Sequence, residues 1–202
     1  PAWPGATTQA GDAWRALLGH MGATVTLDEQ GLTLSGPGAG NYPGIKATMA
    51  EVGELTPTLA AICAYASSPS HLSGIAHLRG HETDRLAALV TEINRAGGQA
   101  EETEEGLIIT PRPLHAAQIC SYADHRMATF GAILGLVTPG ITVDDIACTS
   151  KTLPTFEAMW ASLVGDDGRG SIDAGGSSEG QVHADGHRTA QATPASPIEE
   201  EQ

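Results

Sequence analysis

Two acidic residues beside predicted helix starts are the first candidates for proton-transfer chemistry. Glu82 lies in residues 77–86 (HLRGHETDRL), where helical spacing points it into an apolar face. Burial there would raise its carboxyl pKa, which suits a general acid or base. An ordinary role also stays open, in which Glu82 complements the helix dipole and pairs with Arg85 at i+3. Glu54, in the segment VGELTP, begins an otherwise uncharged helix, so it is either a dipole cap or a base at the mouth of a cleft.

Basic residues within ordered motifs are the second group of candidates. The chain has 10 Lys and Arg against 24 Asp and Glu, so each such cation is a candidate for a specific anion contact. In the segment YADHRMA, Asp124 is the predicted helix cap, and His125 and Arg126 follow in the first turn. A bound anion would relieve the conflict between these cations and the helix dipole. Lys151, in CTSKTLP, lies among hydroxyl residues before another helix. Solvated charges are the alternative in both segments.

Composition excludes several classes of partner. A net charge of −14 argues against nucleic-acid binding through a broad basic surface and against attraction to an anionic membrane. No apolar run is long enough to predict a transmembrane helix. Three cysteines without metal-ligand spacing (Cys63, Cys120 and Cys148) indicate free buried thiols, so we expect a cytoplasmic protein. With only eight aromatic residues, the core must be built from Ala, Leu, Ile and Val.

The spacing of apolar residues predicts an alternation of helices and strands. The predicted helices are residues 11–21, 54–66, 81–96, 124–137 and 154–164, and the predicted strands are 23–27, 32–35, 44–49, 71–78, 99–102, 106–110, 115–121 and 141–145. Residues 44–111 therefore form one βαβαββ unit, and the flanking stretches look like partial copies of it. The fold class is α/β (α+β). Residues 1–164 form the folded part, and residues 165–202 have the composition of a disordered acidic tail.

These elements should bring the chemical segments together. Junctions between strands and helices cluster at one end of α/β units. Several cations beside carboxylate bases suggest an anionic substrate that carries phosphate or carboxylate groups.

The motifs also carry a family resemblance. Residues 77–86 resemble the signature of the 5-enolpyruvylshikimate-3-phosphate (EPSP) synthases, the 3-phosphoshikimate 1-carboxyvinyltransferases. The segments DHRM, TSKTLP and GELTP follow in the family's order and approximate spacing, the last in a form typical of actinobacterial members. The resemblance covers about residues 1–164. It implies the enolpyruvyl transferase fold, with two lobes of three βαβαββ units each. This chain would then be one incomplete lobe, the C-terminal one, without the N-terminal lobe.

The resemblance also implies a reaction. The family transfers the enolpyruvyl group of phosphoenolpyruvate to the 5-hydroxyl of shikimate 3-phosphate and releases phosphate, by addition and then elimination. This is a step of the shikimate pathway of aromatic amino acid biosynthesis. It requires no metal or organic cofactor, and the complete protein is expected to be a monomer. We expect little activity from a chain without its N-terminal lobe.

By motif position, three residues match the family's proton-transfer and acceptor contacts. Glu54 corresponds to the acid that contacts the shikimate hydroxyls and accepts the 5-hydroxyl proton, although many members have Asp there. Glu82 corresponds to the acid/base that protonates the methylene carbon. His81 stands where many members have a lysine that contacts shikimate 3-phosphate. A histidine there would make a charge contact pH-dependent.

Three further residues match the phosphoenolpyruvate contacts. Arg85 and Arg126 correspond to the arginines that clamp this substrate, and Lys151 corresponds to the lysine beside its phosphate. Guanidinium groups suit this role because they bind carboxylate and phosphate in a bidentate way. His125 is adjacent to the clamp, and the resemblance assigns it no definite role.

Two alternatives remain. UDP-N-acetylglucosamine enolpyruvyl transferase shares the fold and the donor, although the HETDRL and KTLP segments favour the shikimate enzyme. A lobe of this kind could also be a non-catalytic anion-binding module or scaffold.

Overall fold

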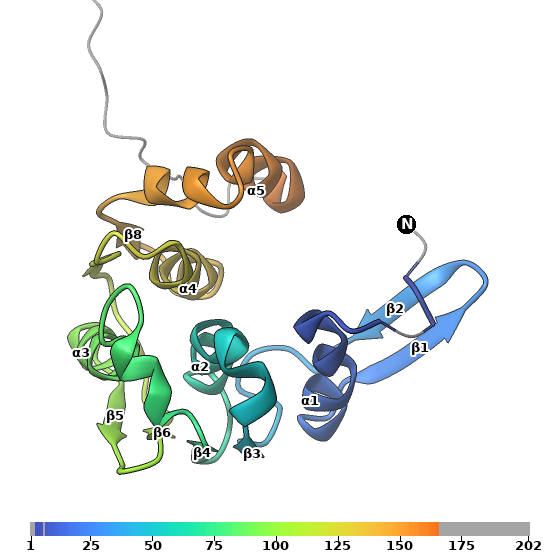
Figure 1. Cartoon of the computed structure of the whole chain (residues 1–202), viewed down its shortest axis with the longest axis horizontal. Helices are drawn as coiled ribbons and strands as arrows, with labels where there is room; N and C mark the ends of the chain where they lie inside the picture. The colour runs from blue at the N-terminus through green and yellow to red at the C-terminus, as the bar shows by residue number, and fades with distance from the viewer. Residues whose placement is uncertain (1–2, 6, 166–202) are drawn as a thin grey trace, which may run out of the picture. The chain divides into compact units, whose positions relative to one another are not determined.

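The computed structural model describes residues 3–5 and 7–165 (Figure 1). The predicted acidic tail, residues 165–202, thus lies outside the described residues except for Gly165. The α-helices are α1 (Trp14–His20), α2 (Thr56–Cys63), α3 (Arg85–Arg95), α4 (His125–Gly135) and α5 (Phe156–Val164). Short 3-10 helices are η1 (Ala10–Ala13), η2 (Ala50–Leu55), η3 (Ala76–Gly80) and η4 (Ile146–Lys151). The strands are β1 (Thr24–Asp28), β2 (Gly31–Ser35), β3 (Lys46–Thr48), β4 (Ser70–Ser73), β5 (Gln99–Glu102), β6 (Leu107–Thr110), β7 (Gln118–Ile119) and β8 (Thr142–Val143).

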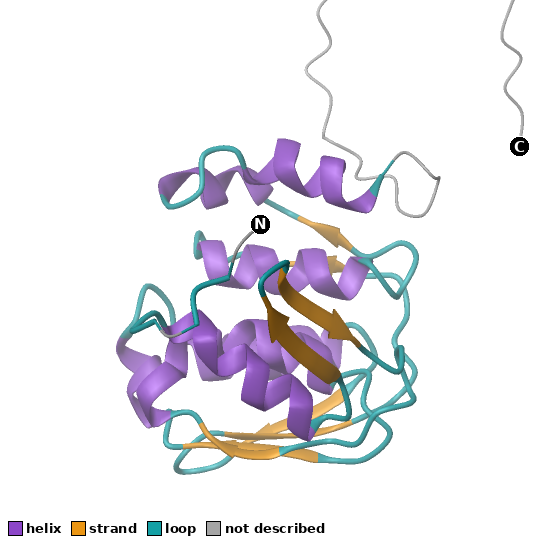
Figure 2. Cartoon of the chain, turned by 90° about the vertical axis from the view of Figure 1, so that its right-hand side faces the viewer, coloured by secondary structure: helices purple, strands orange, loops and turns teal. Residues whose placement is uncertain are grey.

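The predicted βαβαββ unit forms one four-stranded sheet in the order β3-β4-β6-β5. Strands β3 and β4 are parallel and are connected through α2, whereas β6 is antiparallel to both β4 and β5. Burial alternates along β4 and β6, as expected for a sheet with one covered face. Figure 2 shows helices on that covered side. The prediction for residues 44–111 is therefore confirmed.

The flanking stretches have the predicted partial patterns. After α1, strands β1 and β2 form an antiparallel hairpin. Farther along the chain, strand β7 precedes α4 and strand β8 follows it, and these two strands pair in parallel. Both pairs form separate two-stranded sheets, each with part of the secondary-structure order of the central unit.

The strand predicted over residues 71–78 is too long. Strand β4 ends at Ser73, and the chain turns at Gly74, which has a φ of +73°. A β-carbon at Gly74 would lie only 3.3 Å from the Ala50 and Thr48 side chains. This close approach and the left-handed backbone together favour glycine and end the strand, and η3 follows.

The helix predicted over residues 81–96 begins later than expected. Asp84 has an extended backbone, and its carboxylate accepts hydrogen bonds from the amides of Leu86 and Ala87 at 3.1 and 3.0 Å. It is therefore the N-cap, and α3 begins at Arg85. Residues 81–83 lie outside the helix, which changes the environment predicted for Glu82. The predicted end holds, because Gly97 has a φ of +90° just after α3.

The core is aliphatic, as the composition predicted. Helix α2 is almost wholly buried, and it packs against α3 and α4. Phe130 is the only aromatic side chain among the fully buried members of the main core. Ala, Leu and Ile side chains fill most of the rest, together with Met21, Met49, Met127 and Cys63, and no valine is among the buried core residues of the described part of the chain. Small side chains such as Ala allow the three helices to approach closely.

The cysteines are free, but their burial differs from the prediction. Cys63 on α2 is buried, and burial raises the pKa of its thiol to about 11. Cys120 and Cys148 are partly exposed. Among the described helices, none has the length and apolar character needed to span a membrane.

Candidate active site

Helix α4 is the element on which the candidate segments meet. It packs against α2, α3 and η4. As predicted, Asp124 caps this helix, and its carboxylate accepts a hydrogen bond from the Arg126 amide at 2.8 Å. The helix start therefore places Arg126 within hydrogen-bonding distance of Glu54 and His125 3.5 Å from Glu82.

Glu82 contacts residues from two other candidate segments. The Lys151 ammonium donates a 2.5 Å hydrogen bond to Glu82 Oε1, although the two residues are 69 positions apart. His125 Nδ1 lies 3.5 Å from Glu82 Oε2. That ring nitrogen is buried and has no partner with hydrogen-bonding geometry. The contacts thus join the segments around residues 82, 125 and 151.

The predicted environment of Glu82 is wrong in two respects. The residue lies before α3 and is partly exposed, so it does not point into the apolar face of the helix. The hydrogen bond from Lys151 also holds the pKa of the Glu82 carboxyl below its ordinary value, the opposite of the expected rise. The predicted pairing of Glu82 with Arg85 is not observed, because each has a different partner.

Arg85 forms a buried ion pair with Asp124. Its Nε and Nη2 atoms donate to the two carboxylate oxygens at 2.7 and 3.3 Å. The side chains are 4% and 0% exposed. Burial by itself would raise the pKa of Asp124, but hydrogen bonds from Arg85 and the Arg126 amide hold it below the ordinary value. Asp124 therefore caps α4 and orients Arg85.

His81 lies next to this pair. Its Nδ1 is 3.4 Å from Arg85 Nη1, the guanidinium nitrogen that does not contact Asp124. The two histidine rings of His77 and His81 lie 5.8 Å apart. The exposed His81 therefore joins the candidate site through Arg85.

Glu54 and Arg126 form the other edge of the site. Arg126 donates to the Glu54 main-chain carbonyl at 2.9 Å and to its carboxylate at 3.1 Å. Glu54 lies at the end of η2, just before α2, and does not start the helix itself. The neighbouring Gly53 is buried, and a β-carbon there would lie 2.8 Å from His77 Nε2. Glycine thus allows η2 to pack closely against η3.

All seven residues selected from the sequence belong to one connected set of contacts, which is joined through Asp124 by the Arg126 amide at 2.8 Å and by His125 Nδ1 at 3.9 Å. They are Glu54, His81, Glu82, Arg85, His125, Arg126 and Lys151. Sequence reasoning missed Asp124 as the partner of Arg85 and did not select the buried Glu92 on α3. Glu92 lies seven positions after Arg85, a spacing that puts both on the same side of a helix and could have indicated it.

Each cation of the site has an acidic partner. The pairs Glu82–Lys151 and Glu54–Arg126 are partly exposed, so they contribute little stability and can exchange partners with solutes. A substrate anion could therefore replace either carboxylate and bind the released cation. The carboxylate set free in this way would be available for proton transfer.

One group in the described part of the chain also has the spacing of a metal site. Donor atoms of Glu82, Asp124 and His125 lie within 4.8 Å of one another. However, Lys151 binds one oxygen of Glu82, and Arg85 binds both oxygens of Asp124. These cationic donors compete for the same lone pairs, so the donor set favours ion pairing over metal binding.

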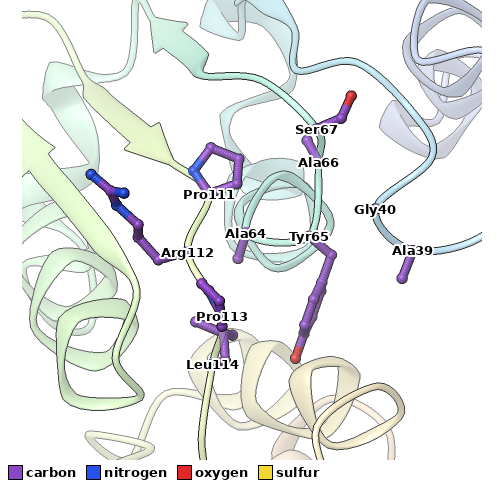
Figure 3. A pocket seen from close by; sticks show the side chains of 10 residues that line it. All are labelled: Ala39, Gly40, Ala64, Tyr65, Ala66, Ser67, Pro111, Arg112, Pro113 and Leu114. Atoms are coloured by element: carbon purple, nitrogen blue, oxygen red, sulfur yellow. The ribbon is translucent and has the colours of Figure 1, made fainter.

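A shallow cavity of about 450 Å³ lies elsewhere on the described structure (Figure 3). Tyr65 and Arg112 are its largest polar lining residues. None of the seven candidate residues lines it.

Comparison with known proteins gives a consistent result. The model of the family described as EPSP synthase (3-phosphoshikimate 1-carboxyvinyltransferase) matches residues 2–160. A 3-phosphoshikimate 1-carboxyvinyltransferase of Kocuria rhizophila is 58% identical over 168 residues. The matched region is 83% of this chain and 37% of that relative, so the chain spans well under half of the relative's length.

Solved structures show the same fold. An EPSP synthase structure from Acinetobacter baumannii matches with a TM-score of 0.64 and 26% identity, over 74% of this chain and 38% of that one. The enolpyruvyl transferase NikO from Streptomyces tendae matches with a TM-score of 0.55 and 18% identity, over 73% and 34%. The second match supports the fold alone.

Proposed function

The chain belongs to the EPSP synthase (3-phosphoshikimate 1-carboxyvinyltransferase) family, and from that premise we propose that it forms the C-terminal lobe of an enzyme that transfers the enolpyruvyl group of phosphoenolpyruvate to shikimate 3-phosphate. The observation that carries the proposal is the convergence of the candidate residues from four distant segments into one set of contacts. The other lobe of the enzyme would come from a sequence that corresponds to the part of the relatives that this chain does not match.

Phosphoenolpyruvate carries a carboxylate and a phosphate, which match the cations available. Arg85 and Arg126 would hold it, and Lys151 would contact its phosphate. Arg126 and Lys151 are accessible, because their own side chains are 32% and 64% exposed. Arg85 is oriented by Asp124 and offers only Nη1, so it would make a single, fixed contact.

The ion pair between Glu82 and Lys151 suggests how proton transfer is coupled to binding. While Lys151 donates to Glu82, the carboxyl has a lowered pKa and is ionised. If the substrate phosphate draws Lys151 away, the cause of that lowering is removed, and the pKa of Glu82 rises. Glu82 can then take up a proton and deliver it to the methylene carbon of phosphoenolpyruvate.

The bond between the 5-hydroxyl oxygen of shikimate 3-phosphate and C2 of phosphoenolpyruvate would form as that proton is added to the methylene carbon. Glu54, released from Arg126, would accept the proton of the 5-hydroxyl while the hydroxyl oxygen attacks C2 of phosphoenolpyruvate. Glu82 would then remove a proton from the new methyl group as the C–O bond to phosphate breaks. The acceptor contacts are Glu54 and His81, and His125 lies 3.5 Å from Glu82, where it can influence that proton. Shikimate-pathway aromatic amino acid biosynthesis in the cytoplasm would be the setting.

The 58% identity to a 3-phosphoshikimate 1-carboxyvinyltransferase favours this acceptor over UDP-N-acetylglucosamine. The retained acids and cations also favour an enzyme over a non-catalytic anion-binding lobe, because a binding module needs no general acid.

The test is phosphate release from phosphoenolpyruvate by two proteins. One is this chain alone. The other is a chimera in which the 168 aligned residues of the Kocuria rhizophila relative are replaced by those of this chain. We expect turnover with shikimate 3-phosphate for the chimera and almost none for the chain alone. A folded chimera that is inactive with this acceptor, or active only with UDP-N-acetylglucosamine, would overturn the proposal.

A further inference from the structure

Glu92 on α3 is a buried carboxylate outside the set of candidate residues. Its side chain is fully buried and accepts three hydrogen bonds. The donors are the Cys120 amide at 3.0 Å, the Tyr122 hydroxyl at 2.7 Å and Arg95 Nε at 3.0 Å. Burying a charge is unfavourable unless it is paired and hydrogen-bonded, and these donors meet that need. Two of them come from the segment just before the α4 start.

The segment that Glu92 holds has an unusual backbone. Tyr122 and Ala123 have φ values of +56° and +54°, and they are the only non-glycine residues with positive φ in the described part of the chain. Left-handed conformations are unfavourable for such residues and persist where surrounding contacts impose them. The turn is closed by a 2.9 Å hydrogen bond from the Asp124 amide to the Ser121 carbonyl.

Helix α3 holds this turn at both ends. Glu92 binds its beginning, at Cys120 and Tyr122, and Arg85 binds its end, at Asp124. Arg85 and Glu92 are seven residues apart, or about 10 Å along one side of a helix. The distance between the two anchors is therefore set by a rigid element. The turn leads directly into His125 and Arg126, so its conformation decides where these side chains lie.

We propose that Glu92 is a positioning residue, which acts through the left-handed turn at Tyr122 and Ala123 to place Arg126 and Asp124 for substrate binding. This inference rests on the proposed function, because Arg126 is assigned there to phosphoenolpyruvate. Glu92 itself is buried and does not contact the substrate. The hydroxyl of Tyr122 transmits its effect.

A pair of matched substitutions separates positioning from general stability. Tyr122→Phe removes only the hydroxyl that Glu92 accepts. Tyr65→Phe removes a comparable hydroxyl, which bonds to the Leu134 carbonyl at 2.8 Å and to Thr138 at 2.7 Å, away from the candidate residues. In the chimera, Tyr122→Phe should raise the KM for phosphoenolpyruvate about ten-fold, as expected when a binding group is displaced. Tyr65→Phe should leave that KM unchanged at a similar loss in melting temperature.

A second substitution tests the role of the strained turn. Glycine adopts the left-handed conformation without the steric cost that alanine has. Ala123→Gly in the Tyr122→Phe background should therefore recover part of the lost affinity. Equal KM values for Tyr122→Phe and Tyr65→Phe, or a further loss with Ala123→Gly, would overturn the inference.

A measurement without substrate keeps this inference separate from the proposed function. Amide hydrogen exchange of residues 119–127 in the 202-residue chain should increase with Tyr122→Phe and not with Tyr65→Phe. Unchanged exchange would overturn the inference even if the enzyme is active. Increased exchange in a protein whose chimera is inactive would support the structural link and leave only the proposed function in error.

Discussion

The ion pairs of the candidate site differ sharply in burial. The Arg85–Asp124 side chains are 4% and 0% exposed, and both groups have additional hydrogen-bond partners. The Lys151–Glu82 side chains are 64% and 32% exposed, and those of Arg126–Glu54 are 32% and 51% exposed. The difference divides the site into a fixed pair and two exchangeable pairs.

Physical chemistry gives the two kinds of pair different roles. A buried pair is held because its charges cannot be separated without leaving one unpaired in a medium that solvates it poorly. An exposed pair is weakened by water and salt, so a competing anion can replace the carboxylate at little cost. The buried pair can therefore fix the position of α4 relative to α3, while the exposed pairs can separate when a substrate anion binds their cations.

The largest effect is expected from breaking the buried pair. Asp124→Ala leaves Arg85 charged and unpaired inside the protein and also removes the cap of α4. The free energy of unfolding should fall by about 3–5 kcal/mol, measured by urea denaturation of the chain.

The double variant Arg85→Met, Asp124→Leu provides the control. It replaces the pair with apolar side chains and should recover much of the lost stability, because neither member of the pair is left buried and unpaired. A loss below about 1 kcal/mol for Asp124→Ala would show that the pair behaves as an exposed one.

The second prediction concerns the exchangeable pair at Glu82. Glu82→Gln keeps the shape of the side chain but removes the proton-transfer group, so phosphate release by the chimera should fall about 10²- to 10⁴-fold. Stability should change little, because the pair with Lys151 is exposed. Glu101→Gln, at an exposed position on β5, serves as the control and should keep full turnover. Turnover of Glu82→Gln equal to that control would remove the acid/base assignment.

Much of the fold follows from local patterns. The alternation of apolar residues in β4 and β6, the glycines after α3 and the Asp124 cap all act within a few positions along the chain. The first two signals predicted the central unit, and the Asp124 cap predicted the start of α4. The start of α3 was misplaced because the prediction extended the helix through residues 81–84, which include no apolar residue, whereas the Asp84 carboxylate accepts hydrogen bonds from two amides and the helix starts at residue 85.

The sequence predicted candidate residues but not the contacts between them. The basic residues were selected because they suit anion binding at helix starts, the two glutamates because they suit proton transfer, and His81 by its position in a motif. Their partners could not be predicted, since Lys151 is 69 positions from Glu82 and Asp124 is 39 positions from Arg85. The pKa direction of Glu82 was consequently wrong, because it depends on one such distant contact.

The third prediction uses pH. The folded state holds the pKa values of Asp124 and Glu82 below their ordinary values of 3.8 and 4.5. Their stabilising contributions are therefore complete above the ordinary values and are lost as the pH falls through the lowered values. The free energy of unfolding, measured in urea at a series of acidic pH values, should decrease with falling pH.

A variant separates the two contributions. Lys151→Met removes the cause of the Glu82 shift and should flatten the acid dependence only slightly, because the buried pair remains. Asp12 outside the site, with its pKa lowered by Arg15, adds an effect of the same sign in both proteins. If Lys151→Met removed most of the acid dependence, the exposed pair would be the stronger of the two.

The smallest effect is expected at the other exposed pair. Glu54→Gln removes the carboxylate that accepts from Arg126 but leaves the Glu54 main-chain carbonyl, which accepts from the same guanidinium at 2.9 Å. The free energy of unfolding should therefore change by less than about 1 kcal/mol. The change should shrink further at high salt, which screens exposed charges. Urea denaturation at low and high ionic strength measures both quantities. A loss as large as that of Asp124→Ala, or one insensitive to salt, would mean that this pair is part of the fixed frame and cannot release Arg126 to a substrate anion.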